Sequence, residues 1–270
     1  MPRYPRLIAV LAALLALSAC ATGEVPTAEE IKQDNADSRA RQFLRVGDAT
    51  RDGGDAVSAL AFYERARTQR PDWPEVQARI GETALALGQA ELARTAFRRQ
   101  ADLAPADAAG FLGLGKALIL LDRPKDAADA FARAAALAPK DYRPLNGLGV
   151  AQDLLGDPQA AQARYKEALA LAPDKASPMN NLGLSLALAG DFEAAIRVLG
   201  QAAKDPQGGA RARHNLAIAL ALSGDMDKAA QIARLDLGEA DVKSNLERYA
   251  ALRAMAPRER ARAVHIGIPE

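Results

Sequence analysis

A 34-residue period runs through most of this 270-residue chain and constrains its fold more than any other feature. Four positions of the period are held by glycine, alanine or proline, and chance agreement of four series at one spacing is not a serious alternative. A period of this length indicates a repeat array, in which each unit buries its apolar face only against its neighbours. The four series are Gly47, Gly81, Gly115, Gly149, Gly183 and Ala217; Ala59, Ala93, Ala127, Ala161, Ala195 and Ala229; Pro71, Pro105, Pro139 and Pro173; and Gly54, Gly88, Gly156, Gly190 and Gly224, interrupted at Asp122.

The residues of a single unit resemble the helix–turn–helix pattern of the tetratricopeptide-repeat family, whose period is 34 residues. In residues 108–141, Gly115 and Ala127 would let the two helices cross closely, because a larger side chain would hold the backbones apart. Phe131 would fill the space between this unit and the next. Pro139 would close the second helix, because proline cannot continue the hydrogen-bond ladder. The second glycine series would end each first helix, where a left-handed residue is favoured.

The resemblance implies an all-α fold, a right-handed superhelix (α-solenoid) of about six units over residues 40–243. Composition agrees, since 49 % of the chain is hydrophobic but only 4 % aromatic, which favours closely packed helices over a sheet. The last unit is degenerate, with Ala233 and Asp241 in place of an aromatic residue and a proline. We expect a capping helix over residues 244–257 and a flexible tail over residues 258–270. The apolar residues of the cap recur at helical spacing, as Leu246, Tyr249 and Leu252.

The first twenty residues have the layout of a lipoprotein signal. A short basic start precedes an unbroken apolar run from Leu7 to Leu17, which at 11 residues is too short to span a membrane. Two small residues then precede Cys20, the only cysteine of the chain, and this ending resembles a lipobox. We therefore expect a signal peptide over residues 1–19 and lipidation of Cys20. The alternative is an ordinary signal peptide with an incidental cysteine.

Lipidation would tether the mature chain to the cell envelope, because two or three acyl chains hold a protein stably on a membrane. By resemblance to the enterobacterial sorting rule, Ala21 favours the outer membrane, with the protein facing the periplasm. Residues 20–39 are polar and have no apolar stripe, so we expect a lipidated N-terminus followed by a polar tether, unless Thr27 and Glu30 form a capping box that starts a helix within it. Without residues 1–19 the chain carries 33 basic and 34 acidic side chains, a net charge of −1. This balance gives no electrostatic reason to expect nucleic-acid binding.

The sequence contains no recognisable catalytic or metal-binding pattern. Its two histidines, His214 and His265, lie far apart, and a single cysteine allows no internal disulfide. The stretch from Gly110 to Lys116 matches the spacing of a phosphate-binding loop, but Ala117 stands where that motif needs serine or threonine for magnesium. We therefore expect no enzymatic activity and no cofactor or metal.

In this repeat family the first helix of each unit lines a concave groove, and one stripe of that helix faces the groove. In the last three units the stripe begins with polar residues and continues with mostly apolar ones. Such a groove suits an extended or helical peptide with one apolar edge and an acidic group. Its asparagines would hold peptide backbone, because an amide both donates and accepts hydrogen bonds; alternatively, these residues are simply solvated. The candidate groove residues are Arg143, Asn146, Asn180, Asn181, Arg211, His214 and Asn215.

Motifs in the last third of the chain point to a narrower family; those within the repeats are generic, while the ending and the lipobox are more telling. The motifs are NNLGL at 180–184, LALAGD at 186–191, the stretch 215–222 and the ending from Asn245 to Pro257. Together with the lipobox, they resemble the TadD-like tetratricopeptide-repeat lipoproteins of the tight-adherence, or Flp, pilus system. The resemblance implies a scaffold that helps the outer-membrane secretin of the pilus to assemble or localise, in the manner of a pilotin. Two other functions stay open: an adaptor that docks envelope proteases or cell-wall hydrolases, and an enzyme.

Overall fold

The computed structural model describes residues 28–204 and 209–266. Within these ranges the chain forms fourteen helices and no strand, as the all-α prediction requires. None of the helices there combines the length and the apolar character needed to cross a membrane. The helices are α2 Ala28–Asp52, α3 Ala56–Gln69, α4 Pro74–Ala86, α5 Ala90–Leu103, α6 Ala108–Leu120, α7 Pro124–Leu137, α8 Tyr142–Leu155, α9 Pro158–Leu171, α10 Ala176–Leu188, α11 Phe192–Ala202, α12 Gly209–Ser223, α13 Met226–Ala233, α14 Glu239–Ala254 and α15 Pro257–His265.

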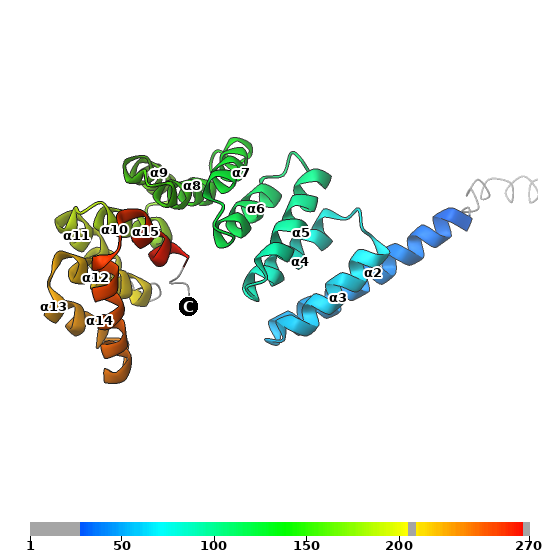
Figure 1. Ribbon diagram of the computed structural model, residues 1–270. Coiled ribbons are helices and arrows are strands. Elements are labelled where there is room, and N and C mark those ends of the chain that lie inside the picture. Colours follow the sequence, from blue (N-terminus) through cyan, green and yellow to red (C-terminus); the bar gives the residue numbers. More distant parts are fainter. Residues whose placement is uncertain (1–27, 205–208, 267–270) are drawn as a thin grey trace, which may run out of the picture.

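Six helix–turn–helix units follow one another along the chain, from the pair α2 and α3 to the pair α12 and α13 (Figure 1). Each helix packs against the next, and the first helices of units 2 to 6 also contact one another. The array bends into an arch that ends at α14. Helix α15 lies inside the bend, beside α8 and α10 (Figure 1). This arrangement confirms the expected solenoid.

The turn inside each unit contains one left-handed residue, as the second glycine series predicts. The glycines of that series have φ between 70° and 103°, and Asp122, which interrupts the series, has φ 54°. In the described ranges Asp122 is the only residue other than glycine with a positive φ. The prolines follow the ends of the second helices; α7, for example, ends at Leu137, two residues before Pro139. Both series therefore stop helices at fixed places, which keeps every unit the same length.

Aromatic rings pack at one repeat position in units 1 to 4, and Leu199 takes this position in unit 5. Phe131 of α7 is 2 % exposed and lies between Gly115 of its own unit and Gly147 of the following one. A Cβ atom at Gly115 would lie 2.6 Å from Phe131 Cε1, and one at Gly147 would lie 2.5 Å from the same atom. No real Cβ tolerates such distances, so the ring needs glycine on both sides. The close crossing predicted at Gly115 and the inter-unit position predicted for Phe131 are both confirmed.

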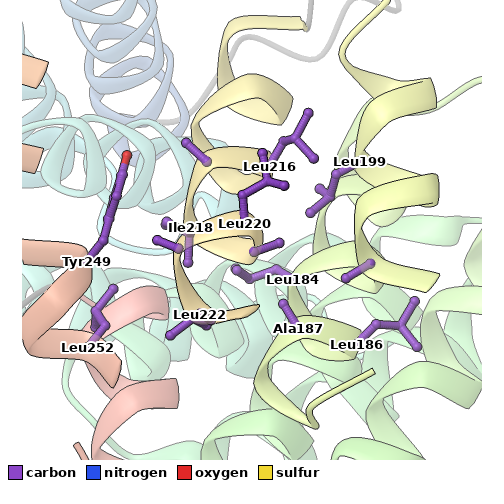
Figure 2. Close-up of a cluster of buried hydrophobic side chains, with 14 of the residues drawn as sticks. Leu184, Leu186, Ala187, Leu199, Leu216, Ile218, Leu220, Leu222, Tyr249 and Leu252 are labelled. Carbon is purple, nitrogen blue, oxygen red and sulfur yellow. The ribbon is translucent and has the colours of Figure 1, made fainter. Parts of the chain in front are cut away.

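An apolar core closes the C-terminal end of the array (Figure 2). Helix α12 is buried all round from Leu216 to Leu222, because α10, α11, α13 and α14 surround it. Tyr249 and Leu252 of α14 are 2 % and 5 % exposed and approach α12 on the side opposite Leu199 (Figure 2). Helix α14 therefore covers the last unit, and it begins five residues before the start expected at 244.

Two segments differ from their sequence-based description. Residues 28–39, expected to be a tether, belong to α2, and Asp37 pairs with Arg70 of α3. Residues 258–265, expected to be a flexible tail, belong to α15 and contact α8 and α10. Residues 28–39 lack an apolar stripe, and α15 combines polar contacts with partial packing of Ala263 and Val264 on the core, so hydrophobic periodicity reveals neither segment. The signal peptide and Cys20 lie outside the described residues.

Candidate partner-binding groove

The first helices of units 3 to 6 line an open groove on the inside of the arch. Helices α6, α8, α10 and α12 provide most of the lining, the end of α15 provides one side, and the hollow measures about 600 Å³. Five of the seven residues expected from the groove stripe line it together, from three successive first helices. They are Arg143, Asn146, Asn181, Arg211 and Asn215.

Hydrogen bonds join the amides of neighbouring helices along the groove. Asn181 Nδ2 donates to Asn146 Oδ1 at 2.9 Å, and Asn146 Nδ2 lies 3.3 Å from Ser177 Oγ. These contacts connect α8 with α10 and fix the orientation of both amides. Each asparagine still has donor or acceptor capacity for a bound backbone, since an amide can make up to four hydrogen bonds. The groove therefore presents oriented polar groups to a ligand.

The positive charge of the groove comes from Lys116 and Arg211 more than from Arg143. The Arg143 guanidinium bonds both carboxylate oxygens of Asp141, at 2.7–3.0 Å, which lowers the pKa of Asp141 and neutralises the arginine. In the described part of the chain, neither Lys116 nor Arg211 lies within salt-bridge distance of an acidic side chain. Both are exposed, one at each end of the row α6, α8, α10, α12. A ligand with an acidic group would be attracted to either end.

The floor between these charges is apolar. Ile119 of α6, Val150 of α8 and Leu184 of α10 line the hollow, and Leu120 beside them is 45 % exposed. Large apolar side chains exposed next to a groove are typical of surfaces that bind a partner. The sequence predicts this combination of a polar entrance and an apolar floor, and the structure places both in one hollow.

The other two candidates, Asn180 and His214, do not line the groove. Asn180 is 2 % exposed and lies inside the packing of the array. His214 turns toward the cap, where its Nδ1 lies 3.2 Å from Tyr249 Oη. Partial burial and the neighbouring Arg248 and Arg211 lower the pKa of His214, and burial raises the pKa of Tyr249 to about 12. Asn180 is therefore buried, with no hydrogen-bond partner for its Oδ1 among the described residues, whereas His214 has a partner in the cap.

A buried polar cluster lies beside the groove, beneath α15. The Asp153 carboxylate accepts hydrogen bonds from Tyr165 Oη at 2.9 Å and from Ser185 Oγ at 2.6 Å. His265 of α15 covers it, with Nε2 3.4 Å from Asp153 Oδ2. Burial and the Asp153 carboxylate raise the pKa of Tyr165 well above its ordinary value. Asp153 belongs to the same stripe as Arg143, but α15 covers it instead of leaving it open to a ligand.

Four of the lining residues that sequence reasoning missed show where its limits lie. Lys116 and Ile119 come from unit 3 and stand 34 residues before Val150 and Asp153, so extending the stripe by one unit would have found them. The other two missed residues come from α15, whose position follows no period, and no pattern in the sequence points to them. These two residues are Val264 and His265.

Glycines that resemble a phosphate-binding motif serve helix packing instead. The stretch from Gly110 to Lys116 lies within α6. A Cβ atom at Gly110 would lie 2.7 Å from the backbone nitrogen of Ala101, so this glycine is needed for close packing on α5. In the ranges that the structure describes, no group of three or more histidine, cysteine, aspartate or glutamate side chains is arranged to hold a metal ion.

Comparison with protein families gives one match. A model described as tetratricopeptide repeat matches residues 79–142, 147–208 and 183–241, which together make up more than half of the chain. No curated protein matches this sequence.

Solved structures share the architecture. PilF of Pseudomonas aeruginosa is 19 % identical, with a TM-score of 0.60 over 80 % of this chain and 99 % of that one. A thermophilic repeat protein of Thermus thermophilus is 24 % identical, with a TM-score of 0.58 over 67 % and 98 %. MamA of Desulfovibrio magneticus is 21 % identical, with a TM-score of 0.55 over 61 % and 93 %. At these identities the likeness shows the fold alone.

Proposed function

Because this chain belongs to the tetratricopeptide-repeat family, whose repeats form scaffolds for protein–protein interaction, we propose that it binds a protein partner in the groove lined by α6, α8, α10 and α12. The observation that carries the proposal is the hollow of about 600 Å³, in which amide and cationic side chains of α8, α10 and α12 lie beside an apolar floor. Repeat arrays use extended concave surfaces of this kind to hold partner segments. Proteins of this fold are generally non-catalytic scaffolds.

The partner segment should combine an apolar edge with an acidic group. Ile119, Val150 and Leu184 can bury the apolar edge, while Lys116 and Arg211 attract the acid. The paired amides of Asn146 and Asn181 can bond the backbone of a segment that lies across α8 and α10. An extended segment or a short amphipathic helix meets these requirements.

We further propose that the protein is lipidated at Cys20 on the outer membrane and assists the secretin of a tight-adherence pilus. The lipobox-like ending at Cys20 supports the anchor, and Ala21 supports the outer membrane. The motifs at 180–191 and 215–222 support the pilus system through their resemblance to TadD-like lipoproteins. An adaptor for envelope proteases or cell-wall hydrolases is the alternative, and it would use the same groove.

The test is an affinity pull-down from membranes with the lipidated full-length protein. We expect the secretin to co-purify, and to be lost when Lys116→Glu and Arg211→Glu reverse the charge of the groove. The matched control reverses two exposed cations on second helices, Lys166→Glu and Arg197→Glu, and should retain the secretin. A Cys20→Ala variant tests the anchor, because it should leave the membrane fraction.

Two results would count against parts of the proposal. Retention of the partner by the groove variant would show that another surface binds it. Recovery of proteases or wall hydrolases in place of the secretin would preserve the scaffold and remove the pilus assignment.

A further inference from the structure

Helix α15 binds the inside of the arch through one face. Arg258, Arg262 and His265 follow one another at helical spacing, so their side chains project from the same side. Arg258 Nη2 donates to the carbonyl oxygen of Leu155 at 2.9 Å, and Arg262 Nη2 lies 2.8 Å from Asp122 Oδ2. His265 covers Asp153. We call the surface formed by Asp122, Asp153 and the end of α8 the α15 seat.

The seat includes the one departure from the second glycine series. Asp122 has φ 54°, a conformation that glycine adopts freely and other residues adopt at a cost. Its carboxylate pairs with Arg262, whereas in unit 4 the same position is Gly156, which Arg258 crosses. A Cβ atom at Gly156 would lie 3.3 Å from Arg258 Nε. The turn of unit 3 therefore offers a carboxylate to Arg262, whereas the turn of unit 4 leaves room for the side chain of Arg258.

The seat is larger than the helix that fills it. In α15 only Ala261 and the His265 side chain are buried, each 5 % exposed, whereas Arg262 and Asp122 remain 52 % and 37 % exposed. A second hollow, of about 450 Å³, is lined by Pro257, Arg258 and Ala261 of α15 and by residues at the ends of α8 and α10. On the other side, Val264 and His265 border the groove. The exposed pair of Arg262 and Asp122 contributes little to stability, so release of α15 costs mainly the buried contact of His265 with Asp153 and the partial packing of Ala263 and Val264 on the core.

We propose that α15 is an internal mimic of the partner, and that the partner binds by placing a basic helix of its own on the α15 seat in exchange for α15. The inference rests on the proposed function, and it specifies the chemistry of one helix of the partner. The partner helix should carry two cations one turn apart, to meet Asp122 and the Leu155 carbonyl, with an apolar side chain larger than Ala261 between them. The larger side chain would fill the hollow beneath it, which α15 leaves open.

The experiment uses a fluorescent peptide of residues 256–270 as the partner helix and measures its anisotropy with the full-length chain. In the unaltered chain the internal copy competes at an effective concentration in the millimolar range, so the peptide should bind weakly. In the Arg258→Glu, Arg262→Glu chain the internal copy carries the wrong charge, and the peptide should bind at least ten-fold more tightly. Adding Asp122→Gly to that chain should reverse most of the gain. Glycine suits the φ of this position, so the turn stays folded.

Three results would overturn the proposal: equal affinity of the peptide for the unaltered and charge-reversed chains, no binding to either, or equal binding by a peptide with both arginines replaced by glutamate. Circular dichroism must show that each variant is folded. The outcome is separate from that of the groove proposal. If secretin capture depends on Lys116 and Arg211 while the peptide fails to exchange, partner binding in the groove is supported. The proposal that α15 mimics the partner is then wrong.

Discussion

Helices α14 and α15 are neighbours separated by two residues, yet different interactions hold them. Helix α14 buries Val242, Tyr249 and Leu252 against α12 and α13. Helix α15 buries Ala261 and the His265 side chain, packs Ala263 and Val264 only partly against the core, and attaches otherwise through arginine side chains. One of these is Arg260, which donates to the carbonyl oxygens at the end of α14. One helix continues the apolar core of the repeats, and the other lies on their surface.

The contrast shows which helix belongs to the scaffold. Burial of apolar surface stabilises by about 25 cal/mol per Å², so a helix with three buried large side chains is fixed in place. Exposed ion pairs contribute about 0–1 kcal/mol each, so the pair of Arg262 with Asp122 should hold α15 less firmly than the apolar core holds α14. This difference assigns α14 to the folded array and motivates the proposed exchange of α15.

The largest expected effect is the loss of the cap. Tyr249→Ala removes a ring that is 2 % exposed and lies beside α12, as Figure 2 shows. Truncating a buried aromatic residue leaves a cavity and should lower the free energy of unfolding by about 3–5 kcal/mol. Urea unfolding followed by circular dichroism measures this change. Glu247→Ala, at an exposed position of the same helix, is the control and should change stability by less than about 0.5 kcal/mol. Equal stabilities of the two variants would contradict the role of α14 as cap.

The repeats themselves provide the next comparison, because their close packing is what α15 lacks. Ala127 of α7 is fully buried where the two helices of unit 3 cross. Ala127→Leu should overpack this crossing and cost about 1–3 kcal/mol. The matched control is Ala132→Leu, at an exposed position of the same helix. An unchanged melting temperature for Ala127→Leu would contradict the repeat register.

A smaller effect is expected at α15. Arg262→Ala removes the ion pair with Asp122 and should lower the free energy of unfolding by less than about 1 kcal/mol, because both side chains are partly exposed. Hydrogen exchange should nevertheless accelerate in α15 and stay unchanged in α14. Arg197→Ala, which removes an exposed ion pair in α11, is the control and should change exchange in neither helix. A loss of several kcal/mol in Arg262→Ala would place α15 in the core.

The two helices also show how far a sequence of this kind can be interpreted without a structure. Apolar periodicity predicted the units, the packing of Phe131 and the burial of Tyr249, because each depends on spacing along one helix. It could not place α15, whose contacts come from arginines spaced as on a polar surface helix. The interruption at Asp122 was visible in the sequence, but its partner Arg262 lies far along the chain, in a segment outside the repeats. The groove was predicted in outline, while the neutralisation of Arg143 depends on side-chain geometry that spacing does not contain.

The smallest expected effect is a pH dependence of the contact between α12 and α14. Partial burial, with Arg248 and Arg211 nearby, lowers the pKa of His214 below its ordinary value of 6.5. The unfolded chain therefore binds more protons at this residue than the folded one, so stability is fully present above pH 6.5 and declines as the pH falls below it. Between about pH 7.5 and 5.5, the melting temperature of the unaltered protein should fall further than that of His214→Gln. The Arg258→Glu, Arg262→Glu chain should keep the dependence of the unaltered protein, because His214 contacts Tyr249 of α14 and not α15. Loss of the dependence on charge reversal in α15 would mean that the two helices are coupled, and that α15 cannot leave its seat without disturbing the cap.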